Sequence, residues 1–437
     1  MATPHTLTRR SLWRLAVVIA VIACGGGSKS AGTVTASGTP DAGTPTVRIA
    51  AFSVGPDETP TYPNSPTDPP YLLDLPDEHT TFIPLGTGPT AYLVFGASRL
   101  SGTNGGAVVL QTTDLQTFRF ADSLGFARQV MTSPVLITQC NPAYVIEFDA
   151  NYAAPGSVVQ DPTLPPGNLI MIYEAENHCP GGVNQQPFYA TVGFARSSDG
   201  GKTWPAPINA PLGGTPRHPV LKGATAQPPA PGYTAMGDAL PSAIVDIGAA
   251  GDPYLYVAYT YHDGGLAPAT DRKIHVARAK LGADPLSFLK WFDGAFSQPG
   301  IGGLDSGVLP ATGCPNGQQF MPEISRNDDL GLYLMVFVCR SGPAGSAAGA
   351  WYYATATSLD LQDWSAPALI QGSQFPVTEP CPGQTTGGQF DGWYPSLVSP
   401  GAAAGHTRLT GRIFFQNGCD TGERQFMSRT FTITLGA

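Results

Sequence analysis

Five copies of one strand pattern recur along the chain at nearly equal spacing. Short apolar runs begin at positions 91, 169, 254, 332 and 412, so successive starts are 78, 85, 78 and 80 residues apart. A second apolar run follows each of them, at positions 107, 191, 274, 351 and 426. Self-similarity at a fixed period indicates a repeat architecture in which each unit packs against its neighbours. We expect these runs to be the second and third strands of five repeated units.

A proline precedes each first run and marks a third series. These prolines are Pro84, Pro134, Pro241, Pro322 and Pro395. Because proline cannot donate to a strand ladder, it is tolerated where pairing begins, and we expect it at the start of each innermost strand. Five multi-stranded units of about 80 residues favour a propeller over a sandwich. The sequence therefore predicts an all-β fold, a five-bladed β-propeller.

The fifth unit needs a fourth strand, because its third run ends at Leu435 near the end of the printed sequence. We expect the segment 47–54 to supply it by pairing beside residues 426–435. That pairing would close the ring and leave no exposed strand edge. Composition agrees with a fold of short strands and tight turns, since 53 glycines and 43 prolines accompany only 13% charged residues.

The N-terminus has the features of an export signal. Arg9, Arg10 and Arg14 precede an apolar run at 15–23, which is shorter than the roughly 20 residues needed to span a bilayer and fits a signal peptide. The run ends in Val-Ile-Ala-Cys24, which resembles the lipobox of bacterial lipoproteins; ordinary cleavage after residue 23 is the alternative. The residues around Arg9 also resemble a twin-arginine signal, so the export route stays open.

These features divide the chain into three segments. Residues 1–24 are predicted to be a lipoprotein signal peptide, 25–46 a flexible tether rich in Gly, Ser, Thr and Pro, and 47–437 a single propeller domain. We expect an exported monomer, anchored by lipid at Cys24 to a bacterial outer membrane or cell surface. The net charge of −9 argues against a nucleic-acid partner, because no basic face could neutralise phosphates.

A turn motif follows the third strand in several units. The segment 197–204 reads Ser-Ser-Asp-Gly-Gly-Lys-Thr-Trp, and shorter versions stand at 112–118 and 358–364, with a degenerate one at 284–291. An aspartate can accept backbone N–H groups in a hairpin turn, a glycine can supply a positive φ, and the closing aromatic can pack beneath. We therefore predict a structural role for the motif residues, which are Asp114, Asp199, Gly201, Trp204, Asp360 and Trp364.

The full motif resembles the Asp-box of sialidases and other BNR-repeat propellers. The blade number and the version at 358–364 resemble the five-bladed arabinanase and xylosidase-type glycosidases. The resemblance extends at the level of fold over nearly all of residues 48–437, and it leaves a six-bladed, sialidase-like propeller as the alternative fold.

Seven cysteines are present, and without Cys24 an even number of six remains, which in an exported protein indicates disulfides. The repeat chooses among the pairings, because neighbouring antiparallel strands bring the residue before an innermost strand close to the residue after a second strand. The predicted pairs are Cys314–Cys339, Cys381–Cys419 and, by elimination, Cys140–Cys179.

The resemblance to five-bladed glycosidases implies three acids on the innermost strands of the first, third and fourth blades. In this sequence they fall on Asp77 (or Asp74), Asp238 and Glu323. Paired carboxylic acids can protonate a leaving oxygen and activate water, and aromatic faces can stack on sugar rings. On the same face we predict substrate-binding residues at Asp391, Trp393, Tyr394, Arg128, Glu174, His178, His262 and Arg340.

Structural roles compete with these assignments. Glu323 can bond to backbone in the central channel, Asp238 can cap a turn through Gly237, and His178 and His262 can be hydrogen-bonding loop residues. No spacing indicates a transition-metal site, and we expect no cofactor, although the sequence leaves a structural Ca²⁺ ion open.

The predicted function is that of a surface lipoprotein acting on glycans, a glycoside hydrolase with paired carboxylates. The alternative is a non-catalytic propeller that binds a carbohydrate or a protein. Carboxyl groups about 5 Å apart would indicate a retaining enzyme and groups about 6.5 to 9.5 Å apart an inverting one.

Overall fold

The structure is a computed structural model that describes residues 48–67, 69–134, 148–178, 188–205, 217–223, 235–247, 251–263, 273–282, 286–310, 312–340, 349–375, 391–418 and 424–436. The predicted signal peptide and tether lie outside these residues. By its internal contacts the chain divides into Met1–Thr46 and Val47–Ala437. Within the described part the only helices are two short 3-10 turns, η1 (Ala121–Leu124) and η4 (Pro315–Gly317). A search of that part for a long apolar helix of membrane-spanning length finds none.

The described strands form four sheets, and in the nine-stranded one β9 (Phe188–Ser197) pairs in parallel with β11 (Ala235–Ile247). We divide that sheet at this parallel pairing and call the resulting successive units blades 1 to 5, each with an inner strand. Blade 1 holds β2 (Thr81–Pro84), β3 (Tyr92–Ser98), β4 (Gly106–Thr112), β5 (Phe118–Phe120) and β6 (Gln129–Thr132). Blade 2 holds β7 (Tyr152–Gln160), β8 (Leu169–Asn177), β9 (Phe188–Ser197) and β10 (His218–Leu221). Blade 3 holds β11 (Ala235–Ile247), β12 (Pro253–Asp263), β13 (Ile274–Lys280), β14 (Phe288–Phe292) and β15 (Ala295–Pro299).

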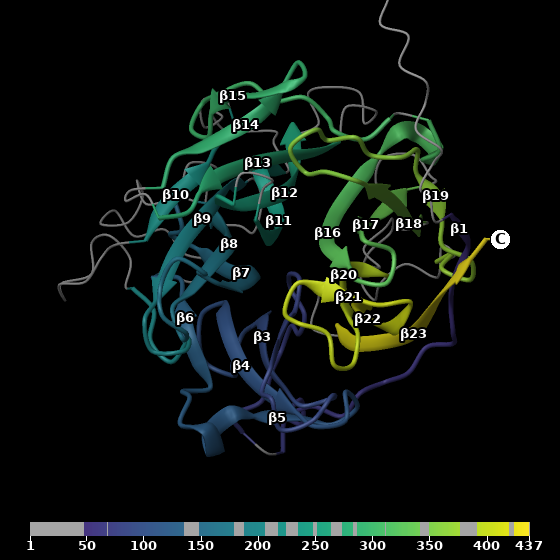
Figure 1. Ribbon diagram of the computed structural model, residues 1–437. Coiled ribbons are helices and arrows are strands. Elements are labelled where there is room, and N and C mark those ends of the chain that lie inside the picture. The colour runs from purple at the N-terminus through teal and green to yellow at the C-terminus, as the bar shows by residue number, and fades with distance from the viewer. Residues whose placement is uncertain are drawn as a thin grey trace, which may run out of the picture. The chain divides into compact units, whose positions relative to one another are not determined.

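Blades 4 and 5 complete the arrangement. Blade 4 holds β16 (Gln319–Asn327), β17 (Leu332–Arg340), β18 (Gly349–Ala356) and β19 (Ala368–Leu369), with the short β21 (His406–Thr407) beside its inner strand. Blade 5 holds β20 (Trp393–Val398), β22 (Thr410–Asn417), β23 (Gln425–Leu435) and β1 (Ile49–Val54). Figure 1 shows these units arranged around a common centre, so the fold is a β-propeller.

The predicted closure of the fifth unit is confirmed. β1 pairs antiparallel with β23, and Phe52 lies opposite Ile433. The first strand of the propeller therefore forms the outer edge of the blade that the last strand builds (Figure 1). The two series of apolar runs form the second and third strands of the blades, as predicted. These strands are apolar along their length because a strand buried on both faces needs apolar side chains on both.

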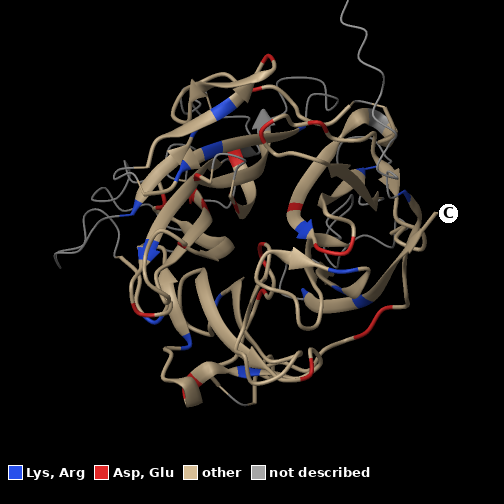
Figure 2. Cartoon of the chain, viewed as in Figure 1, with Lys and Arg blue, Asp and Glu red and all other residues tan. Residues whose placement is uncertain are grey.

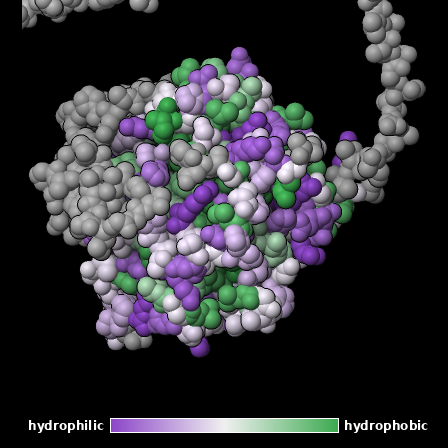
Figure 3. Space-filling model, turned by 60° about the vertical axis from the view of Figure 1, so that its left-hand side comes forward, coloured by the Kyte–Doolittle hydropathy of each residue, from purple (hydrophilic) through white to green (hydrophobic). Residues whose placement is uncertain are grey.

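The space between blades is filled by apolar side chains. Every residue of β3 and of β8 is buried. Between blades 1 and 5, the Phe82 and Phe414 rings lie 4.8 Å apart, and Phe118 packs edge-on to Phe414 at 5.6 Å. On the face shown in Figure 3, hydrophilic and hydrophobic residues are interspersed. The core is thus divided among the contacts between neighbouring blades.

The proline series needs a correction. Pro241, Pro322 and Pro395 stand inside the inner strands, at bulges where the pairing register shifts. The inner strand of blade 2 carries Pro155 at its bulge, so Pro134 does not mark that strand. A bulge leaves one residue outside the ladder, and proline fits there because it has no N–H to pair.

A ring of hydrogen bonds, which we call the inter-blade ring, joins the inner strands of successive blades. The backbone N–H of Val158 donates to Thr81 Oγ1 at 3.0 Å, linking blades 1 and 2. Three more links have the same form, with hydroxyl acceptors. Ala243 N donates to Ser157 Oγ at 2.8 Å between blades 2 and 3, and Ile324 N donates to Ser242 Oγ at 3.1 Å between blades 3 and 4. Thr80 N donates to Ser396 Oγ at 2.8 Å between blades 1 and 5. Between blades 4 and 5 the acceptor is the Glu323 carboxyl, which bonds the backbone of Leu397.

The turn at Asp199 behaves as a hairpin device. Asp199 Oδ1 accepts the backbone N–H groups of Lys202 and Thr203, both at 3.0 Å, while Gly201 has φ of +87°. Burial alone would raise the pKa of Asp199, but its bonds from Thr203 and Ser197 hold the pKa below the usual value. Trp204 packs edge-on against Phe95. The Asp199 carboxylate therefore accepts its hydrogen bonds from within its own turn, which is a structural role.

The version at 358–364 is built differently from the expectation. Asp363 accepts the backbone N–H groups of Thr357 and Ser358, both at 3.1 Å. Asp360 instead accepts hydrogen bonds from Tyr256 and Arg278 of blade 3. Asp360 therefore links two blades, while Asp114 accepts the N–H groups of residues 116 and 117 in its own turn as expected.

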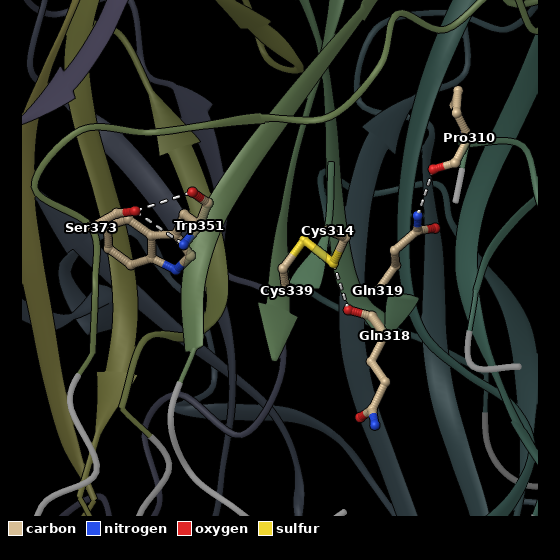
Figure 4. The surroundings of a disulfide bond; sticks show 7 residues. All are labelled: Pro310, Cys314, Gln318, Gln319, Cys339, Trp351 and Ser373. Carbon is tan, nitrogen blue, oxygen red and sulfur yellow. Dashed lines mark hydrogen bonds between the residues drawn. A yellow bond between two sulfur atoms is a disulfide. The ribbon is translucent and has the colours of Figure 1, made fainter. Parts of the chain in front are cut away.

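The predicted Cys314–Cys339 disulfide is confirmed, with Cα atoms 5.5 Å apart (Figure 4). Cys339 lies directly opposite Gln319, at the start of the inner strand, which is the juxtaposition that the repeat predicts. The other four cysteines of the set lie outside the described residues: Cys140, Cys179, Cys381 and Cys419.

Candidate active site

Buried carboxyl groups from two blades meet near the start of the inner strands. Glu78 precedes β2, and Glu174 and Glu176 lie at the end of β8; their exposed fractions are 1%, 3% and 8%. Glu174 Oε2 accepts the backbone N–H of Leu240 at 2.8 Å. Glu78 and Glu174 share a hydrogen bond, and Glu176 Oε2 lies 2.7 Å from His178 Nε2. We call Glu78, Glu174, Glu176 and His178 the acid cluster.

The acid cluster holds protons at neutral pH. Burial, followed by the hydrogen bond and the charge of Glu174, raises the pKa of Glu78 well above its usual value. Burial also raises the pKa of Glu174, although bonds from Glu78 and Leu240 oppose the shift. Glu78 is therefore the donor and Glu174 the acceptor of their shared bond. Two carboxylates this close cannot both ionise in a buried setting.

Glu323 lies on β16 of blade 4 and connects to the acid cluster through His79. Figure 2 shows an acidic segment on β16 facing the middle of the ring. Ser242 Oγ donates to Glu323 Oε2 at 2.9 Å, and His79 Nδ1 lies 3.6 Å from the same oxygen. The backbone N–H of His79 donates to Glu78 at 3.1 Å. His79 thus lies between Glu323 and the acid cluster, to which its neighbour Glu78 belongs.

Glu323 and His79 are both neutral at pH 7. Burial raises the pKa of Glu323 to about 8, against the opposing bonds from Ser242 and Leu397. Burial lowers the pKa of His79 to about 4. His79 Nδ1 lies 2.9 Å from the carbonyl oxygen of Pro395, which can only accept, so this nitrogen carries the proton. The 3.6 Å contact is therefore not an ion pair near neutral pH, although its two side chains could form one if charged.

The repeat offers an internal comparison for two of these acids. Glu323 occupies the position of the inter-blade ring where the other blades carry Thr81, Ser157, Ser242 and Ser396. Glu174 accepts the N–H of Leu240 just as Thr260, one blade later, accepts the N–H of Met321 at 3.1 Å. Hydroxyl groups serve at the other places of the inter-blade ring, and the Thr260 hydroxyl and the Met321 sulfur accept the equivalents of the Leu240 N–H in later blades. A buried carboxyl is more costly to desolvate than a hydroxyl, so the structural bond does not explain why an acid stands there.

The three acids predicted as catalytic are not brought together. Asp238 pairs with Lys290 Nζ at 2.8 Å, and both side chains are fully buried. Asp77 forms an ion pair with Arg424, which directly precedes β23, next to a second pair between Asp74 and Arg99 at 2.5 Å. The Glu323 carboxyl, in contrast, lies 3.6 Å from His79, the residue that follows Glu78 of the acid cluster.

The predicted binding residues divide into those near the cluster and those elsewhere. Tyr394 packs edge-on to His79 at 6.3 Å, with φ of +56° at the bulge of β20. Arg340 lies 5.2 Å from the Trp393 ring, and Asp391 accepts the N–H of residue 418. Glu174 and His178 belong to the acid cluster itself. Glu174, Arg340, Trp393 and Tyr394 lie on β8, β17 and β20, whereas His178 directly follows β8 and Asp391 precedes β20.

Two predicted binding residues are not placed there. Arg128 forms a bidentate contact with the exposed Asp122 and lies beside the outer strands of blade 1, because the strand that follows it pairs with β4. The side chain of His262 lies outside the described residues.

The sequence-based prediction assigned no role to four residues of this region, which are Glu78, His79, Tyr152 and Glu176. The Tyr152 hydroxyl donates to the carbonyl of Asp77 at 2.6 Å. Burial, with nearby Tyr394 and the acid cluster, raises the pKa of Tyr152 well above its usual value. Counting from the starts of the second-strand runs aligns Glu174 with Tyr259, one residue before Thr260, so the spacing of the runs alone does not reveal its equivalence with Thr260. Among the described residues, no group of three or more histidines, cysteines and acids has metal-binding geometry.

No family model matches the sequence, and no curated protein matches it. Among solved structures, it is similar to a GH62 α-L-arabinofuranosidase catalytic domain of Coprinopsis cinerea, at 14% identity and TM-score 0.44, covering 88% of this chain and 98% of that one. It is also similar to an α-L-arabinofuranosidase of Podospora anserina in complex with cellotriose, at 12% identity and TM-score 0.45, covering 88% and 97%. An endo-1,5-α-L-arabinanase of Thermotoga petrophila gives 12% identity and TM-score 0.44, covering 83% and 74%. At these values the likeness assigns neither a family nor an activity to this chain.

Proposed function

We propose that this protein hydrolyses glycosidic bonds, with Glu323 as the general acid. The observation that supports the proposal is that Glu323 and Glu174 are carboxyl groups of raised pKa at positions where other blades make the equivalent bond without a carboxyl group. A glycosidase needs one carboxylic acid that stays protonated near neutral pH and one carboxylate that activates water or attacks the sugar. Glu323, neutral at pH 7, meets the first requirement.

The second group is assigned to Glu176. Its side chain keeps 11% exposure, compared with 16% for Glu323, and its bond to His178 orients it. In the proposed reaction Glu323 gives its proton to the leaving glycosidic oxygen. Glu176 takes a proton from the attacking water, whose oxygen bonds to the anomeric carbon. Asp238 and Asp77 receive no part in this step, because each is already paired with a buried cation.

The remaining sequence-based expectations are proposals of the same standing. We propose that the chain is exported and held at a bacterial membrane by lipid on Cys24, and that it works as a monomer on a glycan partner. A non-catalytic propeller that binds a carbohydrate or a protein is the second candidate. The near-complete burial of Glu78 and Glu174 favours it, because such groups are poorly placed to touch a substrate.

The test is a screen of the purified protein against aryl glycosides and polysaccharides, followed by two variants. Glu323→Gln should abolish the hydrolysis found, because an amide N–H is not acidic enough to protonate the leaving oxygen. Ser157→Ala removes one bond of the inter-blade ring between blades 2 and 3 and should leave turnover within about twofold. The wild-type rate should fall as the pH rises through about 8, where Glu323 ionises. Saturable glycan binding without hydrolysis would replace this proposal with the second candidate.

A further inference from the structure

Blade 3 contains a buried charged group that the proposed reaction does not use. Lys290 on β14 and Asp238 on β11 are both 0% exposed, and their Nζ and Oδ2 atoms lie 2.8 Å apart. A second carboxylate, Asp305 Oδ2, lies 3.2 Å from the same Nζ, and the carbonyl of Lys222 lies at 3.1 Å. Lys290 is thus enclosed by two acids. Its strand, β14, and that of Asp238, β11, are not neighbours in the sheet, and Asp305 follows β15.

The surroundings of this group are aromatic and dry. The Tyr259 ring centre lies 5.6 Å from Lys290 Nζ, and His275 stacks on that ring at 5.7 Å. Tyr259 donates to Asp305 Oδ2 at 2.9 Å. The Oδ1 atom of Asp238 is buried and has no hydrogen-bond partner among the described residues. Keeping a full ion pair in such a place is costly, because both charges lose their hydration.

We propose that Lys290 and Asp238 condense to form an intramolecular isopeptide bond, with Asp305 acting as the proton shuttle. The geometry carries this inference: an amine, an electrophilic carboxyl and a third acid are held in contact inside an aromatic, solvent-excluded core. A neutral amide in their place would remove both buried charges. Fixed proximity of reacting groups supplies effective concentrations far above those of free side chains, about 10⁵ M or more in well-oriented cases.

The protonation states that the step requires lie within the cluster. Burial, together with the charge of Asp305, raises the pKa of Asp238 in spite of the opposing effect of Lys290, so its carboxyl retains a proton more readily than usual. Burial alone would lower the pKa of Lys290, and the two acids raise it, so at rest the amine is charged. The step itself requires transfer of one ammonium proton to Asp305, which leaves the Lys290 nitrogen with a free lone pair; the 3.2 Å contact between Lys290 Nζ and Asp305 Oδ2 provides the path for that proton.

The condensation then balances without any further reactant. The Lys290 nitrogen lone pair forms a bond to Asp238 Cγ, and the C–OH bond of that carboxyl breaks. Asp305 gives its proton to the departing hydroxyl and receives the proton that the nitrogen loses, so one water leaves and Asp305 ends neutral. The Asp305 side chain keeps 15% exposure, which gives the water a route out. The product ties the inner strand of blade 3 covalently to its fourth strand.

Intact-mass spectrometry of the full, reduced protein tests the proposal. The expected mass is lower by one water than the same chain without the bond. Tryptic digestion should not cleave after Lys290, and it should release a branched peptide joining the segments that contain residues 238 and 290. Lys290→Arg and Asp305→Asn should each restore the missing water, the first by removing the nucleophile and the second by removing the shuttle.

A matched control exists in the same blade. Lys280 and Asp252 form the same type of pair at 2.7 Å, with side chains 54% and 43% exposed, so Lys280→Arg should leave the water deficit unchanged. A wild-type mass without the deficit, or a deficit that peptide mapping places elsewhere, would overturn the proposal. The wild-type measurement decides this even where a variant fails to fold.

Discussion

Glu323→Ser is expected to leave the free energy of unfolding nearly unchanged at pH 5 and to raise it at pH 8. Serine is the residue that blades 3 and 5 carry at this place, so the variant can still accept the N–H of Leu397. It removes the buried carboxyl group and the bond from Ser242. The variant therefore removes the carboxyl group but keeps the hydrogen bond of the inter-blade ring, whereas Glu323→Ala would remove both.

The size of the effect follows from proton linkage. The pKa of Glu323 is raised from 4.5 to about 8 on folding, so the stability it contributes is fully present below pH 4.5 and lost as the pH rises through 8. Folding must then take up a proton, which costs about 1 kcal/mol at pH 5 and about 4 kcal/mol at pH 8. Losing the Ser242 bond costs the variant about 1 kcal/mol at any pH. The variant should thus be nearly as stable as the wild type at pH 5 and more stable, by about 3 kcal/mol, at pH 8.

Guanidinium unfolding of both proteins at pH 5 and pH 8 measures this difference. Ser157→Ala is the control, because it loses a ring bond without losing a titrating group and should be destabilised equally at both values. An equal difference between Glu323→Ser and wild type at the two pH values would refute the reasoning, since it would mean that Glu323 is not held neutral by burial.

Three further outcomes are expected. Asp199→Asn should lower the free energy of unfolding by about 1 kcal/mol through weaker turn bonds, with hydrolysis unchanged; a loss of turnover at constant stability would contradict its structural role. Replacing Cys314 and Cys339 by serine opens a link between residues 25 apart in sequence and should cost about 3 to 4 kcal/mol in guanidinium unfolding, whereas an unmoved midpoint would argue against that cost. Cys24→Ser should release the protein from membranes, as fractionation and loss of palmitate labelling would report; a variant that stays membrane-bound and labelled would count against the anchor.

The strand series, the closing pair and one disulfide could be predicted because each depends on position within the repeat. Cys339 lies near the end of a second strand and Cys314 precedes an inner strand, so topology alone brings them together. The bulges could not be placed in the same way. Proline indicates only that a backbone N–H goes unpaired, and both a strand start and a bulge satisfy that condition.

The candidate site was harder to predict because a bulge changes which way the neighbouring side chains face. Asp238 stands before the register shift of β11 and Ser242 after it, so their spacing along the chain does not show which of them reaches the centre. The partner of Asp238 is Lys290, three strands away in the blade, and no local pattern announces it. Glu323 was predicted because the resemblance to five-bladed glycosidases implies an acid on the innermost strand of the fourth blade, and that is the strand on which it lies.

The pairing of β1 with β23 also affects the order in which the molecule can fold. Phe52 reaches its partner Ile433 only when nearly the whole propeller segment is present. Contacts between residues so far apart in sequence form late, because a long loop must close before they stabilise anything. The early blades can assemble from local hairpins, but β1 has no partner until β23 arrives. A chain crossing a membrane from its N-terminus would therefore emerge with its first strand unpaired, and the ring would close as the last step of folding.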